Sequence, residues 1–353
     1  MKILVLEPYY GGSHQSFLAG LAAHLPFVFD IFSLPARGWK WRMRFSALYF
    51  AGILPKTREH DLVLCSTFVD VAALRGLGPS WLAETPILTY YHENQFAYPV
   101  RVDDERDMHF AVTNMMTAAA SDKTAFNSCY NRDTFLAGCR DISRKIPDMK
   151  IDMIGAIRAK AEVLYPPLDF SDLDVAVSSH SSAGRTPVIV WNHRWEHDKN
   201  PELFFDALFR LQEEQVDFNL VLLGQSFAHQ PGIFEKALDR LAHRILHAGF
   251  VHDRNDYYRR LAQGDIIVST SRHEFYGIAV IEAVRAGCRP LLPNKLSYPE
   301  LFPGEFLYEE KDFFHRLREG LRMGSLGTER GRELTRQYSW NYLGGRYKQW
   351  FTA

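Results

Sequence analysis

The chain has 353 residues, of which 46% are hydrophobic and 24% are charged, and its formal net charge is −1. One hydrophobic core rarely serves more than about 250–300 residues, so we expect two domains. A net charge near zero excludes a general attraction to polyanions, so any contact with nucleic acid would need a local basic patch.

The four cysteines are scattered without a C-x-x-C pair. This spacing argues against a disulfide framework and a zinc site, and it fits a reducing cytoplasm. The N-terminal sequence "MKILVLEPYY" enters a strand-like segment without the pattern of a signal peptide. No apolar run reaches the roughly 20 residues of a membrane span. We therefore expect a soluble, cytoplasmic protein with no membrane contact.

Short apolar runs recur along the chain and alternate with helical stretches. In the first half they read KILVLE, FVFDIFSL, DLVLCST, PILTYYHE, KTAFNS and AEVLYP. In the second half they read PVIVWNH, FNLVLLG, ILHAGFV, DIIVSTS, CRPLLPN and EFLYEE. Continuous apolar runs are typical of parallel strands buried on both faces. We predict an α/β fold of two Rossmann-like, doubly wound domains that face a central ligand cleft.

A serine-rich stretch with Gly and Pro at its end, residues 171–187, is the clearest linker by composition. We therefore expect a first domain over residues 1–168, a linker over 169–186 and a second domain over 187–335. Residues 336–353 are expected to form a C-terminal helix, for which packing on the first domain is one option.

The first strand ends in the glycine-rich turn "EPYYGGSHQSF". Gly11 and Gly12 permit a positive φ and a close backbone approach, and Ser13 is expected to cap a helix that begins near His14. Such a turn can bind an anion or another ligand. It is equally an ordinary turn between a strand and a helix.

Cations and aromatic rings alternate in the segment "PARGWKWRMRFSALYF", residues 35–50. The cations are Arg37, Lys40, Arg42 and Arg44, and the rings are Trp39, Trp41 and Phe45. Cations for phosphates together with rings for unstacked bases suit an RNA-binding surface. The alternative is an amphipathic segment that covers the edge of the cleft, which could also meet lipid head groups.

The fourth strand ends in "YYHENQFAYP", where four polar side chains follow one another. They are His92, Glu93, Asn94 and Gln95. Polar clusters at the carboxyl ends of strands favour a functional interpretation. We expect no metal site here, because no second cluster with ligand spacing accompanies it.

In the second half, "VIVWNHRWEHDKNP" carries Arg194 and Lys199 just after a buried strand. Two cations in such a loop can hold a diphosphate through charge-assisted bonds. The alternative is a solvated basic loop in which these cations pair with Glu196 and Asp198.

The stretch "SRHEFYGIAVIE" sets Glu274 in a loop, Gly277 at the turn into a helix and Glu282 inside that apolar helix. Two carboxylates near a helix start could be a glycosidase pair, a metal site, a sugar clamp or surface charge. A carboxylate within so apolar a helix needs a partner from the protein or a ligand. The helix start adds partial positive charge, which favours a phosphate.

Residues 187–300 resemble the family-4 retaining glycosyltransferases of the GT-B fold. The resemblance rests on an E-x7-E motif formed by Glu274 and Glu282, on the pair Arg194 and Lys199, and on "GDIIVSTSRHEFYG" before the helix. It implies that Glu274 holds the sugar and Glu282 holds the ribose of the nucleotide. It also implies a phosphate or sugar contact from the backbone amides of Phe275, Tyr276 and Gly277. His92 would then lie near the transferred carbon.

The first domain resembles the N-terminal domain of the tRNA-queuosine α-mannosyltransferases. The motifs that carry this resemblance are "EPYYGGSHQSF", "YYHENQFAYPV", "RDMHFAVTN" and "FNSCYNRDTFL". It implies an acceptor-binding first domain, GDP-mannose as the sugar donor and the cyclopentenediol of queuosine in tRNA of the tRNA-Asp type as the acceptor. It favours RNA contact for the basic segment and a place in the acceptor or cleft loops for the polar residues after the first and fourth strands.

No metal or other cofactor is expected, because two cations and a helix start neutralise the diphosphate. The alternatives are a glycoside hydrolase, a nucleotide-sugar epimerase or phosphorylase, and a non-catalytic RNA-binding protein. A further alternative is a glycosyltransferase of the same fold acting on a lipid or saccharide. The oligomeric state is not predicted.

Overall fold

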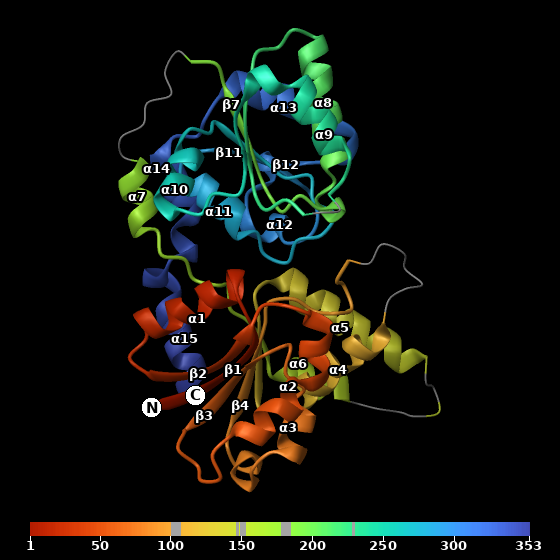
Figure 1. Ribbon diagram of the computed structural model, residues 1–353, viewed down its shortest axis with the longest axis vertical. Helices are drawn as coiled ribbons and strands as arrows, with labels where there is room; N and C mark the ends of the chain where they lie inside the picture. Colours follow the sequence, from red (N-terminus) through yellow and green to blue (C-terminus); the bar gives the residue numbers. More distant parts are fainter. Residues whose placement is uncertain (100–106, 146–147, 149–152, 178–184, 228–229) are drawn as a thin grey trace. The chain divides into compact units, whose positions relative to one another are not determined.

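The computed structural model describes residues 1–99, 107–145, 148, 153–177, 185–227 and 230–353. These residues form two compact units (Figure 1). Unit 1 comprises Met1–Leu168 together with Trp340–Ala353, and unit 2 comprises Asp169–Ser339.

Unit 1 is built on a six-stranded sheet with the order β2-β1-β3-β4-β5-β6, in which neighbouring strands are parallel. The strands are β1 (Lys2–Tyr10), β2 (Val28–Pro35), β3 (Leu62–Ser66), β4 (Ile87–Tyr91), β5 (Lys123–Phe126) and β6 (Ala161–Val163). The helices are α1 (Gly12–His24), α2 (Trp39–Ile53), α3 (Val71–Leu77), α4 (Met108–Ala120), α5 (Cys129–Arg144), α6 (Met153–Ala159) and α15 (Trp340–Thr352).

Alternate residues of β1 serve the two faces of this sheet. Ile3 and Val5 pack with α1 and α15, whereas Leu4 and Leu6 pack with α2 and α3. A strand buried on both faces requires apolar side chains at every position, which explains the continuous run in the sequence.

The C-terminal helix α15 is part of the core of unit 1. Tyr347 is fully buried, and its hydroxyl donates to the Tyr90 hydroxyl at 3.2 Å and to the Tyr165 carbonyl at 3.1 Å. Trp340 lies over Gly20 of α1, where an added Cβ would be only 2.7 Å from the indole ring. The tail therefore packs on the first sheet.

Unit 2 has a second six-stranded parallel sheet with the order β12-β11-β10-β7-β8-β9. The strands are β7 (Val188–Asn192), β8 (Asn219–Leu223), β9 (Ile245–Gly249), β10 (Ile266–Val268), β11 (Arg289–Pro293) and β12 (Leu307–Tyr308). The helices are α7 (Ser171–Val177), α8 (Pro201–Glu213), α9 (Ile233–Arg240), α10 (Arg254–Ala262), α11 (Ile278–Arg285), α12 (Tyr298–Leu301), α13 (Phe313–Met323) and α14 (Thr328–Thr335).

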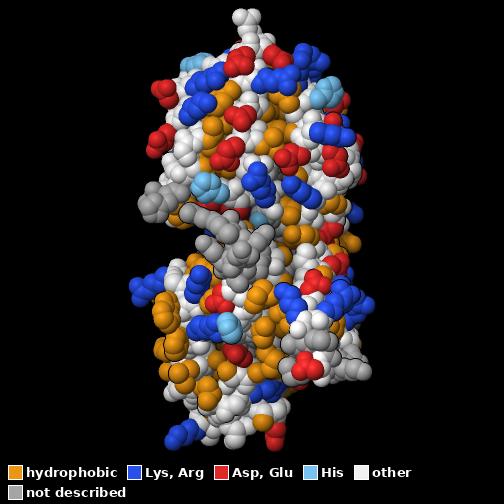
Figure 2. Space-filling view, turned by 90° about the vertical axis from the view of Figure 1, so that its right-hand side faces the viewer, with side chains coloured by type: hydrophobic (Ala, Val, Ile, Leu, Met, Phe, Trp, Pro, Cys, Tyr) orange, Lys and Arg blue, Asp and Glu red, His pale blue; other side chains and the backbone are white. Residues whose placement is uncertain are grey.

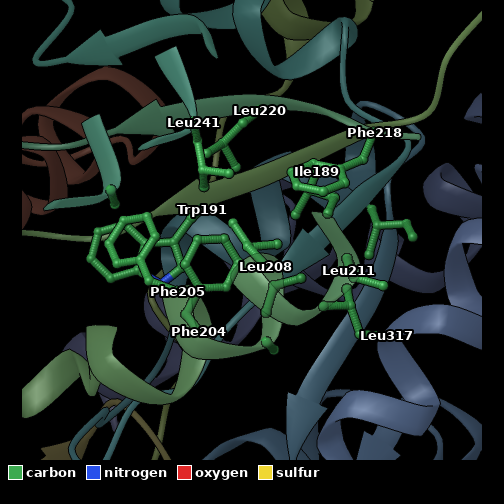
Figure 3. Packing of buried hydrophobic residues seen from close by; sticks show 14 of the residues in the cluster. Ile189, Trp191, Phe204, Phe205, Leu208, Leu211, Phe218, Leu220, Leu241 and Leu317 are labelled. Carbon is green, nitrogen blue, oxygen red and sulfur yellow. The ribbon is translucent and has the colours of Figure 1, made fainter. Parts of the chain in front are cut away.

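The core of unit 2 is dominated by aromatic rings between β7 and the helices α8 and α9 (Figure 3). Trp191 lies 5.9 Å from Phe204 in a stacked arrangement, and Phe205 meets Phe234 edge to face at 5.2 Å. All four rings are fully buried, so each contributes a large apolar area to stability.

The prediction of a linker over residues 169–186 was wrong for part of that segment. α7 belongs to unit 2, where it buries Leu173 and Val177. Asp174 accepts hydrogen bonds from Arg285 at 2.8 and 2.6 Å. Acidic residues in the first turn stabilise a helix start, and this favours α7 despite the serine-rich composition that follows. Residues 178–184 of the predicted linker lie outside the described residues.

The end of unit 2 also differs from the predicted boundary at residue 335. Arg336–Tyr338 form a 3-10 turn, and the buried Tyr338 donates its hydroxyl to the Leu301 carbonyl at 2.6 Å. This bond ties the turn to unit 2, which therefore extends to Ser339.

Each sheet has a point where the strand order reverses. In unit 1 the reversal lies between β1 and β3, and in unit 2 it lies between β7 and β10. Loops at the carboxyl ends of strands beside such a reversal are the usual ligand sites of open α/β sheets. The loops after β1, β7 and β10 are therefore candidate ligand sites, and the loop after β4 carries the predicted polar cluster of residues 92–95.

Candidate functional site

Lys199 is the central cation of the loop after β7. It lies in a short 3-10 turn (His197–Lys199), is only 6% exposed and donates from Nζ to the His273 carbonyl at 2.7 Å. Its Nζ is also 3.3 Å from Oδ2 of Asp198 and 3.5 Å from Oε2 of Glu274. The loop thus fixes a buried ammonium group between two carboxylates.

Arg194, the other predicted diphosphate ligand, is more accessible. Its side chain is 51% exposed and its Nη2 is 3.1 Å from Oε2 of Glu196. Burial alone would raise the pKa of Asp198, but Lys199 and then Arg194 outweigh burial and hold that pKa below its usual range. Both cations therefore act on the same carboxylate. The pairing with Glu196 and Asp198 that we considered as an alternative is present, although Lys199 is buried rather than solvated.

The loop after β10 carries Glu274 toward Lys199. Its Oε1 accepts the Tyr276 backbone N–H at 3.4 Å, while the side chains of Phe275 and Tyr276 are buried. Gly277 has φ 106°, a conformation that favours glycine, and it is the N-cap of α11. The backbone amides of this turn thus lie at the start of the helix, as the sequence predicted, and one of them already contacts a carboxylate.

Glu282 lies in α11 and has partners within the protein. Its Oε2 accepts the Tyr257 hydroxyl at 2.7 Å, and its Oε1 is 3.4 Å from Nη2 of Arg254. Asn192, at the end of β7, donates in turn to the Tyr257 hydroxyl at 2.9 Å. Burial raises the pKa of Glu282 despite these two partners. The residues on α10 that hold Glu282 were not predicted, because they are far from it in the sequence.

The turn after β1 differs in one respect from its prediction. α1 begins at Gly12 with Gly11 as its N-cap, and no side chain caps it, so the prediction of a Ser13 cap was wrong. Gly11 is required for a close approach instead, since an added Cβ would lie 2.7 Å from Cβ of Ala36. Gly12 has φ 54°, and Ser13 is exposed.

His14 lies at the centre of a charged cluster in unit 1. Its Nδ1 is 3.0 Å from Oε2 of Glu7, and its Nε2 is 3.6 Å from Oε2 of Glu93. Burial alone would lower the pKa of His14, but Glu7 and then Glu93 outweigh burial and raise the pKa to about 10. His14 is therefore an imidazolium at neutral pH.

Glu7 was missed as a functional candidate, because it stands inside an apolar strand. Only 2% of it is exposed, and its Oε1 accepts the Tyr9 backbone N–H at 2.8 Å and the Ser66 hydroxyl at 3.2 Å. A charged residue within a buried strand is the signal that could have identified it.

The His92 ring lies against the His14 ring, with a ring-centroid distance of 4.1 Å and an interplanar angle of 31°. Burial, and then the cationic His14, hold the pKa of His92 well below its usual range. Its backbone carbonyl accepts the Asn127 side-chain amide at 2.6 Å. The structure thus pairs a charged histidine with a neutral one.

Of the other predicted residues in this loop, Asn94 is structural. It is fully buried, its Nδ2 donates to Oδ1 of Asn131 at 2.9 Å, and its Oδ1 accepts the backbone N–H groups of Phe96 and Ala97 at 3.0 Å. These bonds show that Asn94 shapes the turn after β4, and its predicted place in an acceptor or cleft loop stays a prediction. Gln95 is also buried, and its backbone N–H donates to Oδ1 of Asn114 at 3.0 Å.

Glu93 keeps capacity for a ligand. Its Oε1 is buried and has no hydrogen-bond partner among the residues that the structure describes. An unpaired carboxylate oxygen at this depth is costly, so a donor from a bound molecule would stabilise it.

The predicted RNA-contact residues lie at the start of α2. Arg37 and Lys40 are exposed, Arg42 donates to the Pro35 carbonyl at 3.4 Å, and Nη2 of Arg44 is 3.6 Å from Oδ2 of Asp107. They gather where α2 begins, with Arg37 just before the helix, and their contact with RNA stays a prediction.

Two further observations concern metals and membranes. Within the described part of the chain, no group of three or more His, Cys, Asp or Glu side chains is arranged to hold a metal ion. No described helix is both long enough and apolar enough to span a bilayer.

The chain is similar to known glycosyltransferases over both units. Residues 2–168 match the family described as tRNA-queuosine alpha-mannosyltransferase N-terminal, and residues 176–306 match glycosyl transferases group 1. A Drosophila melanogaster tRNA-queuosine alpha-mannosyltransferase is 38% identical over 314 residues, which are 87% of this chain and 83% of that protein.

Solved structures show the same fold. Anabaena HepE in complex with UDP has a TM-score of 0.67 at 14% identity, with all of both chains covered. The catalytic domain of starch synthase IV from Arabidopsis thaliana, bound to ADP and acarbose, has a TM-score of 0.71 at 14% identity, with 99% of this chain and 98% of that chain covered. Both sheets and their helices therefore form a GT-B fold, and the chain belongs to the tRNA-queuosine alpha-mannosyltransferase family of glycosyltransferases.

Proposed function

We propose that the chain transfers mannose from GDP-mannose to the cyclopentenediol of queuosine at the wobble position of tRNA, with retention of anomeric configuration. The observation that supports this most strongly is the 38% identity to the Drosophila melanogaster enzyme, which extends over 87% of the chain and therefore includes both units. Cytoplasmic tRNA of the tRNA-Asp type is the acceptor that the proposal requires.

In this proposal unit 2 binds the donor. Lys199 and Arg194 hold the diphosphate, and the start of α11 adds partial positive charge. Glu274 is the more exposed of the two carboxylates beside Lys199, at 22% against 13% for Asp198. The incoming diphosphate would replace Glu274 at Lys199, and the released carboxylate would bind sugar hydroxyls. Glu282 would bind the ribose.

Unit 1 binds the acceptor in this proposal. The bond between the anomeric carbon and the diphosphate oxygen breaks as the acceptor hydroxyl bonds to the same carbon from the same face. The departing phosphate oxygen takes the hydroxyl proton. His92, which is neutral, would stabilise the developing positive charge on the sugar through its ring or its carbonyl. No metal is needed, because the two cations of unit 2 neutralise the leaving group.

The proposal is tested by incubating the protein with labelled GDP-mannose and tRNA that contains or lacks queuosine. We expect a mannosyl-queuosine nucleoside by mass spectrometry only with the queuosine-containing tRNA, and no loss of product with a chelator. Release of the label by an α-mannosidase checks retention, because GDP-mannose is an α-glycoside. Transfer to some other acceptor, with the wobble nucleoside unmodified, would contradict the tRNA assignment.

Variants test the donor residues in the same assay. Arg194→Ala should raise the KM for GDP-mannose and abolish most transfer, because a charge-assisted contact to the diphosphate is lost. Arg318→Ala is the matched control, since Arg318 is similarly exposed at 42% and forms an ion pair with Glu214. Equal turnover in both variants would exclude Arg194 from the diphosphate site.

A further inference from the structure

The helix α2 exposes a continuous apolar face that no part of the described chain covers. Its members are Trp41, Phe45, Leu48, Tyr49 and Ile53, with exposed fractions of 71, 52, 57, 47 and 46%. These positions recur at the spacing of one helix face. Figure 2 shows hydrophobic side chains gathered on the surface of unit 1 beside Lys and Arg side chains.

The opposite face of α2 is firmly packed. Met43, Ala47 and Phe50 are buried, and the Ser46 hydroxyl donates to the Phe68 carbonyl at 2.7 Å. The fold therefore does not need the exposed face, and a row of five large apolar side chains exposed along one helix usually meets a partner.

The rings at the start of α2 lie against each other. Trp41 and Phe45 have a ring-centroid distance of 5.7 Å and an interplanar angle of 27°. Flat rings exposed to solvent are the surfaces on which unstacked bases of single-stranded RNA stack.

Charge at this end of α2 favours an anionic partner. Five cations and no acidic residue occur over residues 35–56. Four of the cations, at positions 37, 40, 42 and 44, surround the two rings in the sequence. A nucleic acid is a polyanion that also presents flat apolar surfaces, so it matches the cations and rings at the start of α2. The aliphatic side chains of the face, Leu48 and Ile53, lie farther along the helix.

This end of α2 is continuous with the loop that holds His14. Ala36, just before α2, touches Gly11 of that loop, as the 2.7 Å distance to an added Cβ shows. Phe68 bridges the two regions, because it packs with Met43 of α2 and lies 5.6 Å from the His14 ring, edge to face. A nucleoside bound at His14 would therefore place its neighbouring nucleotides beside the start of α2, the helix end that carries the exposed rings on its outer face.

We propose that Trp41 and Phe45 form a stacking platform for a base adjacent to the modified nucleoside, while the cations around them contact the flanking phosphates. That the RNA is a tRNA rests on the proposed function. The platform would then contact the single-stranded anticodon loop, where bases are available for stacking.

The test compares acceptors and side-chain chemistry at one position. Trp41→Ala should raise the KM for queuosine-containing tRNA about tenfold, the scale of one lost base stack, with kcat and the KM for GDP-mannose unchanged. Trp41→Phe should stay within about twofold of the wild type, whereas Trp41→Leu should behave like Trp41→Ala, because leucine is apolar but cannot stack. Tyr342→Ala removes a ring that is 59% exposed on α15 and is the matched control.

Two other outcomes would overturn the platform. Unchanged tRNA kinetics in Trp41→Ala and Phe45→Ala would do so directly. Full activity of Trp41→Leu, with loss of binding to anionic phospholipid vesicles in Trp41→Ala, would assign the face to a membrane surface instead.

Failure of the proposed function is distinguishable from failure of the platform. If the wild type transfers no mannose, direct binding of a fluorescent anticodon stem-loop to the same variants still reports the platform. Binding that depends on Trp41 without transfer would retain the platform and reject the function. Mannose transfer that does not depend on Trp41 would retain the proposed function and reject the platform.

Discussion

Both units place a buried cation between two carboxylates beside the reversal point of the sheet, yet the two arrangements differ in where the carboxylates come from. The two sets are His14 with Glu7 and Glu93 in unit 1, and Lys199 with Asp198 and Glu274 in unit 2. In unit 1 one carboxylate belongs to a strand and is 2% exposed, whereas in unit 2 both belong to loops and are 13% and 22% exposed. A carboxylate in a strand cannot move away, so it fixes the charge of its partner.

This difference separates a cation that serves the protein from a cation that can serve a ligand. His14 keeps its proton because Glu7 is held in place, and burial together with the charge of His14 lowers the pKa of His92 and keeps it neutral. Lys199 has two loop carboxylates as partners, and a diphosphate can compete for the more exposed one. In each set the more distant carboxylate is also the more exposed one, Glu93 at 3.6 Å and Glu274 at 3.5 Å. These two are the candidates for substrate contact.

Lys199→Met should have the largest effect and would test the ligand role of the unit 2 cation. In the proposed function the variant loses the charge opposite the diphosphate, so we expect kcat/KM to fall by about 10²–10³. It also leaves Asp198 without its ion-pair partner, so the free energy of unfolding should fall by about 3 kcal/mol. Transfer kinetics and urea denaturation measure the two effects. Lys311→Met removes an exposed lysine of the same unit and is the control.

If Lys199→Met loses stability but keeps its transfer rate, the cation of unit 2 is structural like that of unit 1. The difference between the two units would then disappear.

Glu7→Gln should have the next largest effect and tests the structural role of the unit 1 cation. The pKa of His14 is about 10 in the folded chain and about 6.5 in an unfolded one. The folded state therefore gains stability that is complete below pH 6.5 and is lost as the pH rises through about 10. Glu7→Gln should lower the free energy of unfolding by about 3 kcal/mol near pH 7, and this difference should shrink above pH 10.

Two measurements check this expectation. Urea denaturation of both proteins between pH 6 and 10.5 gives the difference in stability. NMR titration of the histidine rings should show His14 protonated and His92 neutral at pH 7.5. Titration of both rings near pH 6.5 would show that Glu7 does not fix the charge.

The fold could be predicted almost completely from the sequence, but the ion pairs and hydrogen bonds of the two sites could be predicted only in part. All twelve apolar runs are strands in the structure, because a parallel strand buried on both faces leaves an uninterrupted apolar signature. α7 escaped prediction, since seven residues with two buried side chains carry no clear helical period.

Candidate site residues were found where they follow a strand, and their partners were missed where they do not. Lys199 and Glu274 stand in loops whose position the strands fix, so the sequence indicates that they come together. Glu7 lies inside a strand, and Tyr257 lies on a helix 25 residues before its partner Glu282. Pairs of this kind depend on how helices pack on the sheet, which a single sequence does not display.

Glu274→Gln should have the smallest effect on binding and gives the sharpest distinction between the two units. If a diphosphate replaces Glu274 at Lys199, removing the negative charge relieves that competition. We therefore expect GDP to bind about two- to fivefold more tightly, as for one partly exposed ion pair. Transfer should nevertheless slow, because the amide holds the sugar hydroxyls less strongly than a carboxylate does.

The corresponding change in unit 1, Glu93→Gln, is the matched comparison. Glu93 is the more distant and more exposed carboxylate beside His14, as Glu274 is beside Lys199. In the proposed function, however, His14 contacts no phosphate. The affinity for GDP, measured by calorimetry, should therefore stay unchanged in Glu93→Gln. The KM for the tRNA should rise, because the unpaired Oε1 of Glu93 no longer offers a negative charge to a hydrogen-bond donor of the tRNA. Equal GDP affinities in Glu274→Gln and wild type would show that Lys199 does not exchange partners. His14 and Lys199 would then differ only in how exposed their partner carboxylates are, because neither would release a carboxylate to a ligand.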